Sequence, residues 1–155
     1  MSKLKIAVIG TGLVGTFHAE AFFRNPNSEL VAVCDVDKEK VNSVAQSFNC
    51  KAYEDFTKLI NTETLDAISI ATPEQIRIEP AVMSVKKGLK ILLEKPLGRN
   101  LEKIHELVDK IKDHKKIISV NFILHEDPRY KLMKEKVKNN EIGNIVSCFA
   151  RRRGN

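Results

Sequence analysis

The sequence has no tryptophan, only 6% aromatic residues and no apolar run long enough to cross a membrane. Its N-terminal apolar run breaks at Gly10, which predicts a strand and not the core of a signal peptide. Cysteine is also rare, because Cys34, Cys50 and Cys148 are odd in number and widely spaced. A disulfide scaffold and a cysteine-rich metal site are therefore excluded. We expect a cytoplasmic protein without membrane contact.

Part of the positive charge of the chain lies in the run Arg151-Arg152-Arg153, and much of it is scattered. The 155 residues carry a formal net charge of +6, and the lysines scatter over the expected helices. A nucleic-acid-binding surface would concentrate such charge on one element and interleave it with aromatic residues. We therefore expect solvated helix faces and no nucleic-acid partner. No set of histidine, cysteine and carboxylate residues has the spacing of metal ligands, so no metal is expected.

The strongest positive signal is a glycine motif, Gly-x-Gly-x-x-Gly, at Gly10, Gly12 and Gly15. An apolar strand-like run precedes it, a helix-like stripe follows it, and Asp35 ends the next strand-like run 20 residues after Gly15. This arrangement is typical of a dinucleotide site. The first glycine permits a tight turn, the second lets the backbone approach a pyrophosphate, and the third lets helix and strand pack closely. Asp35 would accept hydrogen bonds from the ribose hydroxyls.

Strand and helix signals then alternate along the chain. Strands are expected over Lys3–Gly10, Glu29–Asp35, Leu65–Ala71, Lys90–Leu93 and Lys116–Val120, and a helix over 12–25. Two further helices are expected to begin after the capping residues Asp37 and Asn100. A short helix is expected around 56–60, and another from Asp127-Pro128 to about residue 139. Near Pro80 a helix either begins late, at about Ile78, or kinks. This alternation predicts an α/β fold, a doubly wound and mostly parallel Rossmann sheet with helices on both faces.

Ligands of such sheets bind beyond the carboxyl ends of the strands. The expected cofactor contacts are therefore the glycine loop, Asp35 and two later strand ends: Gly10, Thr11, Gly12, Leu13, Val14, Gly15, Asp35, Ala71, Thr72, Pro73, Glu94 and Lys95. NAD is favoured because an acid at position 35 repels a 2′-phosphate, although the nearby Lys38 leaves NADP open. Glu94-Lys95-Pro96 holds a basic group on a stiff turn, where Lys95 could donate a proton to a substrate oxygen.

These motifs, together with Asn140-Glu141-Ile142-Gly143-Asn144, resemble the N-terminal domain of the Gfo/Idh/MocA oxidoreductase family. The resemblance implies a dehydrogenase or reductase in which Lys95 lies near the nicotinamide and the reacting oxygen of a small sugar-, polyol- or acid-like substrate. It also implies a second domain and a homo-oligomer. Residues 1–120 would form the dinucleotide-binding domain. Residues 121–155 would be a crossover helix and the first strand, Ile145–Arg153, of a truncated second domain, so that the chain alone has no turnover.

Two departures from the family pattern stand out. Where members often carry Thr-Pro-Asn-x-x-His, this chain has Thr72-Pro73-Glu74-Gln75-Ile76-Arg77, and His125 stands where arginine is common. Arg77 and His125 either recognise an anionic substrate or serve as structural or surface residues. For His18, on the first helix, a packing or surface role is favoured over site chemistry, and His105 and His114 are expected to be solvated. The alternative function is a non-catalytic dinucleotide-binding module or sensor.

Overall fold

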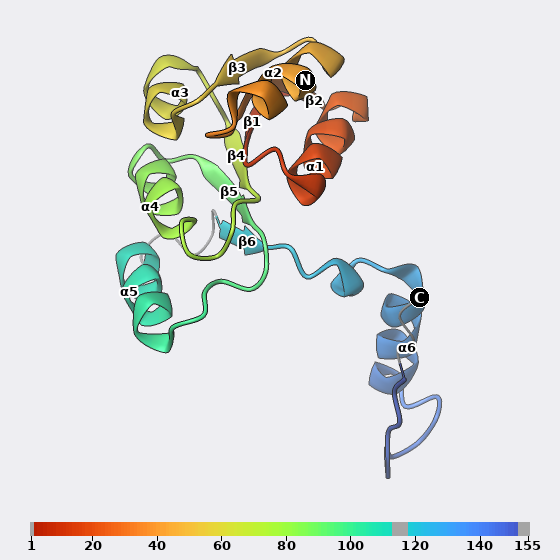
Figure 1. The fold of residues 1–155 in the computed structure, drawn as a ribbon. Coiled ribbons are helices and arrows are strands. Elements are labelled where there is room, and N and C mark those ends of the chain that lie inside the picture. Colours follow the sequence, from red (N-terminus) through yellow and green to blue (C-terminus); the bar gives the residue numbers. More distant parts are fainter. Residues whose placement is uncertain (1, 113–117, 152–155) are drawn as a thin grey trace. The chain divides into compact units, whose positions relative to one another are not determined.

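The structure is a computed structural model that describes residues 2–112 and 118–151. Its chain divides into two compact units, Met1–Asn121 and Phe122–Asn155. Unit 1 carries a sheet and the helices that cover it, and unit 2 carries one long helix (Figure 1).

Unit 1 is built on one six-stranded sheet in the order β3-β2-β1-β4-β5-β6. Every neighbouring pair runs parallel. The strands are β1 (Leu4–Ile9), β2 (Ser28–Cys34), β3 (Lys51–Tyr53), β4 (Ala67–Ile70), β5 (Lys90–Leu93) and β6 (Ile118–Val120). Because β1 lies between β2 and β4, the strand order reverses there, as in a doubly wound dinucleotide fold. The expected Rossmann sheet is confirmed.

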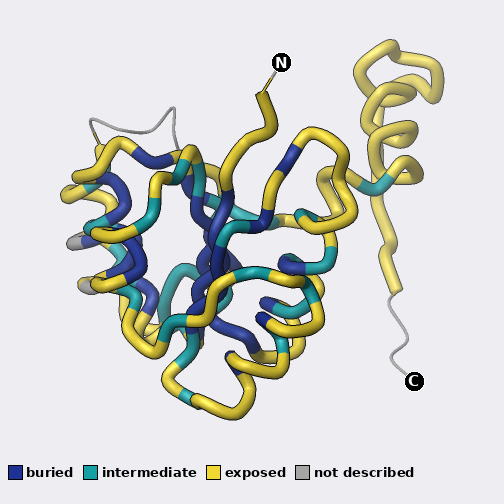
Figure 2. The backbone as a smooth tube through the Cα atoms, turned by 90° about the horizontal axis from the view of Figure 1, so that it is seen from above, coloured by how far each residue is buried: buried dark blue, intermediate teal, exposed yellow. Residues whose placement is uncertain are grey.

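Helices cover both faces of this sheet (Figure 1). On one face lie α1 (Leu13–Arg24) and α2 (Lys38–Ser47), and on the other lie α3 (Phe56–Thr62), α4 (Ile78–Lys86) and α5 (Leu101–Ile111). Successive side chains of β1 point to opposite faces, so Val8 packs with α1 and α2 while Ala7 and Ile9 pack with the other helices. The buried residues therefore follow the central strands (Figure 2).

The helix ends follow the capping chemistry of the sequence. Asp37 accepts a hydrogen bond from the Lys40 N–H, and an Asn100 side chain oxygen accepts one from the Glu102 N–H. Of the two alternatives near Pro80, the late start is the one observed. Pro80 is the third residue of α4, where the first turn needs no intrahelical N–H donor.

One strand of the sheet was not expected. The sequence analysis missed β3, a three-residue edge strand whose residues are exposed or half-buried and so lack an apolar run. The strand expected from Lys116 is observed as β6 from Ile118, and the first two residues lie outside the described part of the chain.

Unit 2 consists of a 3-10 turn, η2 (Ile123–His125), and the helix α6 (Pro128–Lys138). Asp127 caps α6 by accepting a hydrogen bond from the Arg129 N–H at 2.9 Å. The strand expected over Ile145–Arg153 is not observed for residues 145–151, which adopt no regular structure; the last two residues lie outside the described range. A strand exists only when a neighbouring strand accepts its hydrogen bonds, and no described segment pairs with these residues.

Candidate functional site

The loop between β1 and α1 depends on glycine at its first position. Gly10 has a φ of 94°, a conformation that residues with a Cβ rarely adopt. Its N–H donates to the Cys34 carbonyl at 2.7 Å, and a Cβ at this position would lie 2.9 Å from the Ala71 carbonyl atoms. Gly10 thus brings the ends of β1, β2 and β4 together.

The other two glycines have opposite surroundings. A Cβ on Gly15 would lie 1.8 Å from the Gly10 carbonyl oxygen, so α1 can approach the loop only because this residue has no side chain. A Cβ on Gly12 would meet nothing within 4 Å, and Gly12 lines an open cleft. The packing of the described residues therefore requires Gly15 but not Gly12. The space beside Gly12 suits a ligand that approaches the backbone, as a pyrophosphate does.

Gly12 is also the N-cap residue of α1, and it supplies no side-chain hydrogen bond to the helix. A twelve-residue helix has free N–H groups and a positive partial charge at this end. An anion placed beside Gly12 would meet both, which fits a dinucleotide phosphate.

Asp35 follows β2 and is half-buried beside the glycine loop. Its Oδ2 accepts hydrogen bonds from the Thr11 N–H at 2.7 Å and from the Thr11 hydroxyl at 3.1 Å. Its Oδ1 accepts one from the Asp37 N–H at 3.0 Å. A carboxylate has about four acceptor positions, so these three bonds fix Asp35 and leave about one position, on Oδ1, for a ligand hydroxyl.

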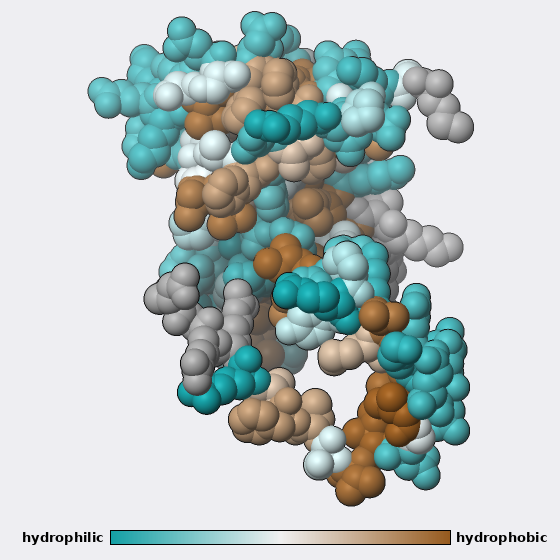
Figure 3. Space-filling model, turned by 90° about the vertical axis from the view of Figure 1, so that its right-hand side faces the viewer, coloured by the Kyte–Doolittle hydropathy of each residue, from teal (hydrophilic) through white to brown (hydrophobic). Residues whose placement is uncertain are grey.

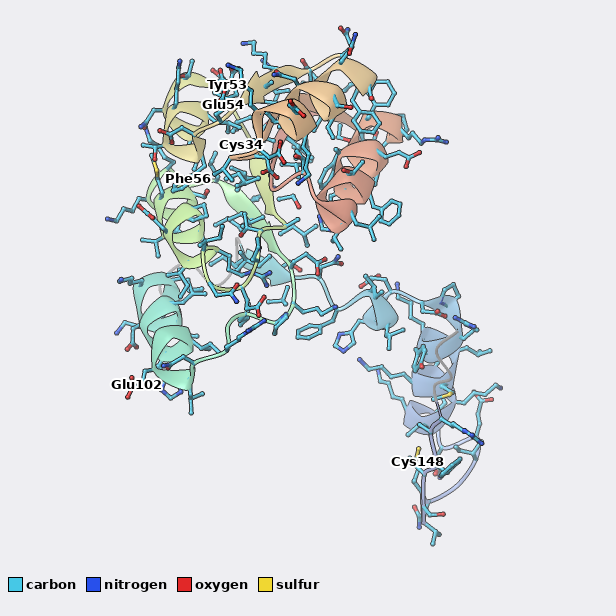
Figure 4. All side chains as sticks on the ribbon, in the orientation of Figure 1. Cys34, Tyr53, Glu54, Phe56, Glu102 and Cys148 are labelled. Atoms are coloured by element: carbon cyan, nitrogen blue, oxygen red, sulfur yellow. The ribbon has the colours of Figure 1, made fainter. Side chains whose placement is uncertain are left out.

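A cleft of about 1160 Å³ runs along the carboxyl ends of β1, β2, β4 and β5. All of the expected cofactor contacts line it except Thr11 and Gly15. Thr11 is 4% exposed and acts behind the loop by holding Asp35, while Gly15 packs on Gly10. Three more residues line the cleft near the end of β2, and Figure 4 labels them: Cys34, Glu54 and Phe56. Cys34 is the last residue of β2, Glu54 follows β3, and Phe56 is the first residue of α3.

Apolar side chains flank the cleft on the α1 side. Leu13 is 75% exposed and Val14 43% exposed although both line the cleft. Figure 3, which views the molecule from the side on which α1 lies, shows apolar residues interspersed with polar ones on this surface.

Lys95 is exposed, lines the cleft and follows a buried acid. Glu94 is only 7% exposed, and its Oε2 accepts a hydrogen bond from the Lys95 N–H at 3.1 Å. The Asn121 side-chain amide donates to Glu94 Oε1, and His18 Nε2 lies 3.3 Å from the same oxygen. The acid therefore anchors the peptide that carries Lys95.

His18 belongs to this polar cluster, although the sequence favoured a packing or surface role for it. Its Nδ1 lies 2.7 Å from the hydroxyl oxygen of Ser69, a fully buried residue of β4. The contacts favour the tautomer with a proton on Nε2, because that N–H then donates to Glu94 while Nδ1 accepts from Ser69. Burial lowers the pKa of His18, against the opposing effect of the neighbouring Glu94 carboxylate.

Arg77, one of the two departures from the family pattern, lies inside unit 1. It is 3% exposed, and its guanidinium donates to the carbonyls of Thr72, Glu94 and Pro96. The structural role is therefore the one that the contacts support. His125 lies in unit 2, where it is exposed and its ring stands 5.7 Å from that of Phe122.

The remaining histidines contribute little. His105 is exposed on α5, as expected, and His114 lies outside the described residues. Within the described part of the chain no group of three or more histidine, cysteine or acidic residues could hold a metal ion. None of the described helices combines the length and apolar composition that a membrane span requires.

Two buried polar atoms around the cleft lack a partner among the described residues. They are the Thr72 hydroxyl oxygen and Arg77 Nε. Thr72 lines the cleft at the end of β4, so a ligand hydroxyl or amide could satisfy its hydroxyl group. Together with the space beside Gly12, this unpaired group fits a dinucleotide that extends from the glycine loop towards Lys95.

Comparison with known proteins agrees with this geometry. A family model described as an oxidoreductase family with an NAD-binding Rossmann fold, GFO_IDH_MocA, matches residues 4–122. Inositol 2-dehydrogenase of Rubrobacter xylanophilus is 30% identical over 143 residues, which are 91% of this chain and 41% of that protein. Glucose-6-phosphate 3-dehydrogenase of Bacillus subtilis is 31% identical over 92% of this chain and 40% of that protein.

Solved structures show the same likeness. Myo-inositol 2-dehydrogenase from Lactobacillus plantarum superimposes with a TM-score of 0.87 at 30% identity, covering 94% of this chain and 44% of that one. Myo-inositol dehydrogenase from Lactobacillus casei, solved with NAD(H) and myo-inositol, gives a TM-score of 0.84 at 31% identity, covering 91% and 43%. The chain thus spans about two fifths of the length of the relatives that it matches.

Proposed function

The chain belongs to the Gfo/Idh/MocA oxidoreductase family, and from that premise we propose that it supplies the cofactor half of a dehydrogenase. The reaction is hydride transfer between a nicotinamide and a hydroxyl or carbonyl carbon of a small substrate. The observation that carries the proposal is the open space beside Gly12, at the N-terminus of α1, in the same cleft as Asp35 and Lys95.

Three parts of the cleft would hold the dinucleotide. The Gly10–Gly15 loop and the start of α1 would bind the pyrophosphate through backbone N–H groups. Asp35 would accept hydrogen bonds from the ribose hydroxyls, and the unpaired Thr72 hydroxyl would meet the part nearer to the nicotinamide. Ala71 and Pro73 would line the same part of the cleft.

NAD is the cofactor that this cleft favours over NADP. The Asp35 carboxylate would repel a 2′-phosphate in the place where it would bind a hydroxyl. Lys38 is the nearby cation that could have favoured NADP. Its Nζ forms an ion pair at 3.5 Å with Glu54, which lines the cleft, so its positive charge already has an acidic partner.

When bound, the cofactor supplies the hydride acceptor or donor. The contribution of this chain to the chemistry is the Lys95 ammonium, which would hold a proton next to the substrate oxygen and polarise it or donate to it. Glu94 accepts a hydrogen bond from the Lys95 N–H and so fixes the peptide that carries the side chain. Replacing Lys95 by methionine should leave NADH binding largely intact while removing that proton donor.

The substrate is proposed to be a polyol or sugar. The relatives named above are dehydrogenases of inositols and of glucose 6-phosphate. Because this chain spans about two fifths of their length, a second domain would supply most substrate contacts, and assembly as a homo-oligomer in the cytoplasm is part of the same proposal. The alternative, a non-catalytic binding module, is not favoured, because the relatives are enzymes.

Titration of the 155-residue protein with NADH, followed by the fluorescence of the nicotinamide, tests the proposal. We expect saturable binding at a single site, competition by ADP, and weaker binding of NADPH. A folded protein that binds neither NADH nor ADP would overturn the proposed function.

A further inference from the structure

Arg77 joins the two loops that follow β4 and β5. It is the N-cap residue of α4 and is 3% exposed, so its side chain points into the protein. Nη2 donates to the Thr72 carbonyl at the end of β4, and Nη1 donates to the carbonyls of Glu94 and Pro96 after β5. The last two residues flank Lys95 directly.

This arrangement suits arginine in particular. A guanidinium carries five N–H donors in a rigid plane, and three of them are engaged here by carbonyls on two different loops. Burial lowers the pKa of Arg77, while the nearby Glu74 and Glu94 charges oppose that effect. A buried cation without such partners would be costly, so the side chain and the two loops hold each other in place.

A second contact ties the same two loops. Glu74, in the loop after β4, forms an ion pair with Arg99 in the loop after β5. Arg99 is 75% exposed, so this pair contributes less than the buried guanidinium. Glu74 and Arg77 are the residues at which this chain departs from the Thr-Pro-Asn-x-x-His pattern. Both departures therefore add a link between the two loops.

We propose that Arg77 is a positioning residue for the nicotinamide end of the cleft. By tying the carbonyls on both sides of Lys95 to the Thr72 loop, it holds in place the two loops that would enclose the nicotinamide. This inference rests on the proposed function. It also assigns Arg77 a role other than binding an anionic substrate, because three of its donors are committed to backbone carbonyls.

The test compares two ligands across three variants. Arg77→Met removes every donor and keeps a side chain of similar length, whereas Arg77→Lys keeps the charge but offers one nitrogen in place of a planar fork. The matched control is Arg24→Met, since Arg24 is also a helix-terminal arginine but is exposed and forms an ion pair with Glu20 on the surface. In the proposed binding mode NADH would reach both ends of the cleft, while ADP would reach only the glycine loop and Asp35.

For both Arg77 variants we expect NADH affinity to fall about tenfold, the equivalent of losing one charge-assisted hydrogen bond, while ADP affinity changes less than twofold. Arg24→Met should bind both ligands as the unchanged protein does. The ratio of the two affinities is the deciding quantity, because a general loss of stability would move both ligands together.

An equal loss of NADH and ADP affinity, or no loss of either, overturns the assignment of Arg77. If Arg77→Met does not fold, Arg77→Lys decides alone, and NADH binding by that variant at the original affinity counts against the proposal. Failure of the unchanged protein to bind either ligand is a different result, because it overturns the proposed function and this inference with it.

Discussion

The Thr11 N–H and the Thr11 hydroxyl both donate to one oxygen of Asp35, at 2.7 and 3.1 Å. Thr11 belongs to the glycine loop and Asp35 to the end of β2, so these bonds join the parts of the cleft that are proposed to bind the pyrophosphate and the ribose. Because Thr11 is buried, its N–H relies on Asp35 for a hydrogen-bond partner. Asp35 thus has a structural task as well as its proposed ribose contact.

Asp35→Ala should therefore have two effects. We expect NADH affinity to fall about tenfold and NADPH affinity to fall much less, because the variant loses a ribose acceptor but also loses the charge that repels a 2′-phosphate. We also expect the free energy of unfolding to drop by about 1–3 kcal/mol, since the buried Thr11 N–H is left unpaired. Fluorescence titration and urea unfolding measure the two effects.

Asp37→Ala is the matched control for this experiment. Asp37 caps α2 by accepting from the Lys40 N–H, so its loss should lower stability by about 1 kcal/mol without changing the preference for NADH over NADPH. An equal loss of both cofactors in Asp35→Ala would count against Asp35 as the ribose ligand.

Gly12 and Gly15 should respond in opposite ways to a side chain. Gly12→Val places its new atoms in open space, so the protein should fold with its unfolding free energy changed by about 1 kcal/mol or less, yet NADH should no longer bind. Gly15→Ala places a Cβ 1.8 Å from the Gly10 carbonyl oxygen, and we expect a loss of about 3 kcal/mol or more. Circular dichroism and NADH titration of the two variants separate these effects. Unchanged NADH affinity in folded Gly12→Val would remove the pyrophosphate from this loop.

The sequence predicted those features of the site that depend on local chemistry. Gly10 must turn tightly, Gly15 must let α1 approach, and Asp35 must end the second strand. Each of these requirements can be recognised from the residue itself and its neighbours in the sequence. The same holds for the fold, because apolar runs and helix caps, such as those at Asp37, Asn100 and Asp127, are local signals. Strand order then follows from the connection rules for parallel sheets.

The sequence could not predict contacts between residues far apart in the chain. His18 meets Ser69 across 51 positions and Asn121 across 103, and no local pattern marks such a pair. Arg77 was open between substrate recognition and a structural role because its partners are backbone carbonyls, which every residue has. The edge strand β3 was missed for a related reason, since its pairing with β2 and not its own composition makes it a strand.

The three cysteines should differ sharply in reactivity. Burial, with the charges of Asp35 and Asp55, raises the pKa of Cys34 to about 12, and burial raises that of Cys50 to about 11. Cys148 is exposed. Because the thiolate is the reactive form, iodoacetamide at pH 8 should add rapidly to Cys148 alone, and to all three after unfolding. Intact-mass measurement counts the adducts, and Cys148→Ser should remove the rapid one. Rapid addition at a second site in the native protein would contradict the burial of Cys34 and Cys50.

His18 should make the stability of unit 1 sensitive to acid. Its pKa is lowered from 6.5 in the folded protein, because burial disfavours the charged ring more than Glu94 favours it. The groups around the ring are Glu94, Ser69 and Asn121, and only Glu94 among them carries a charge. The unfolded chain therefore binds a proton at higher pH than the folded one. Stability is fully present above pH 6.5 and falls as the pH drops from there towards the lowered pKa.

Urea unfolding at a series of pH values tests this linkage. The unchanged protein should lose stability below pH 6.5 with a slope from His18 of at most about 1.4 kcal/mol per pH unit. His18→Gln should lack that share of the loss, because glutamine retains hydrogen-bonding groups but does not titrate. His105→Gln is the control, since His105 is exposed and should leave the profile unchanged. If His18→Gln and the unchanged protein lose stability in parallel between pH 7 and 5, the pKa of His18 is not lowered by folding and the surroundings do not hold the ring neutral.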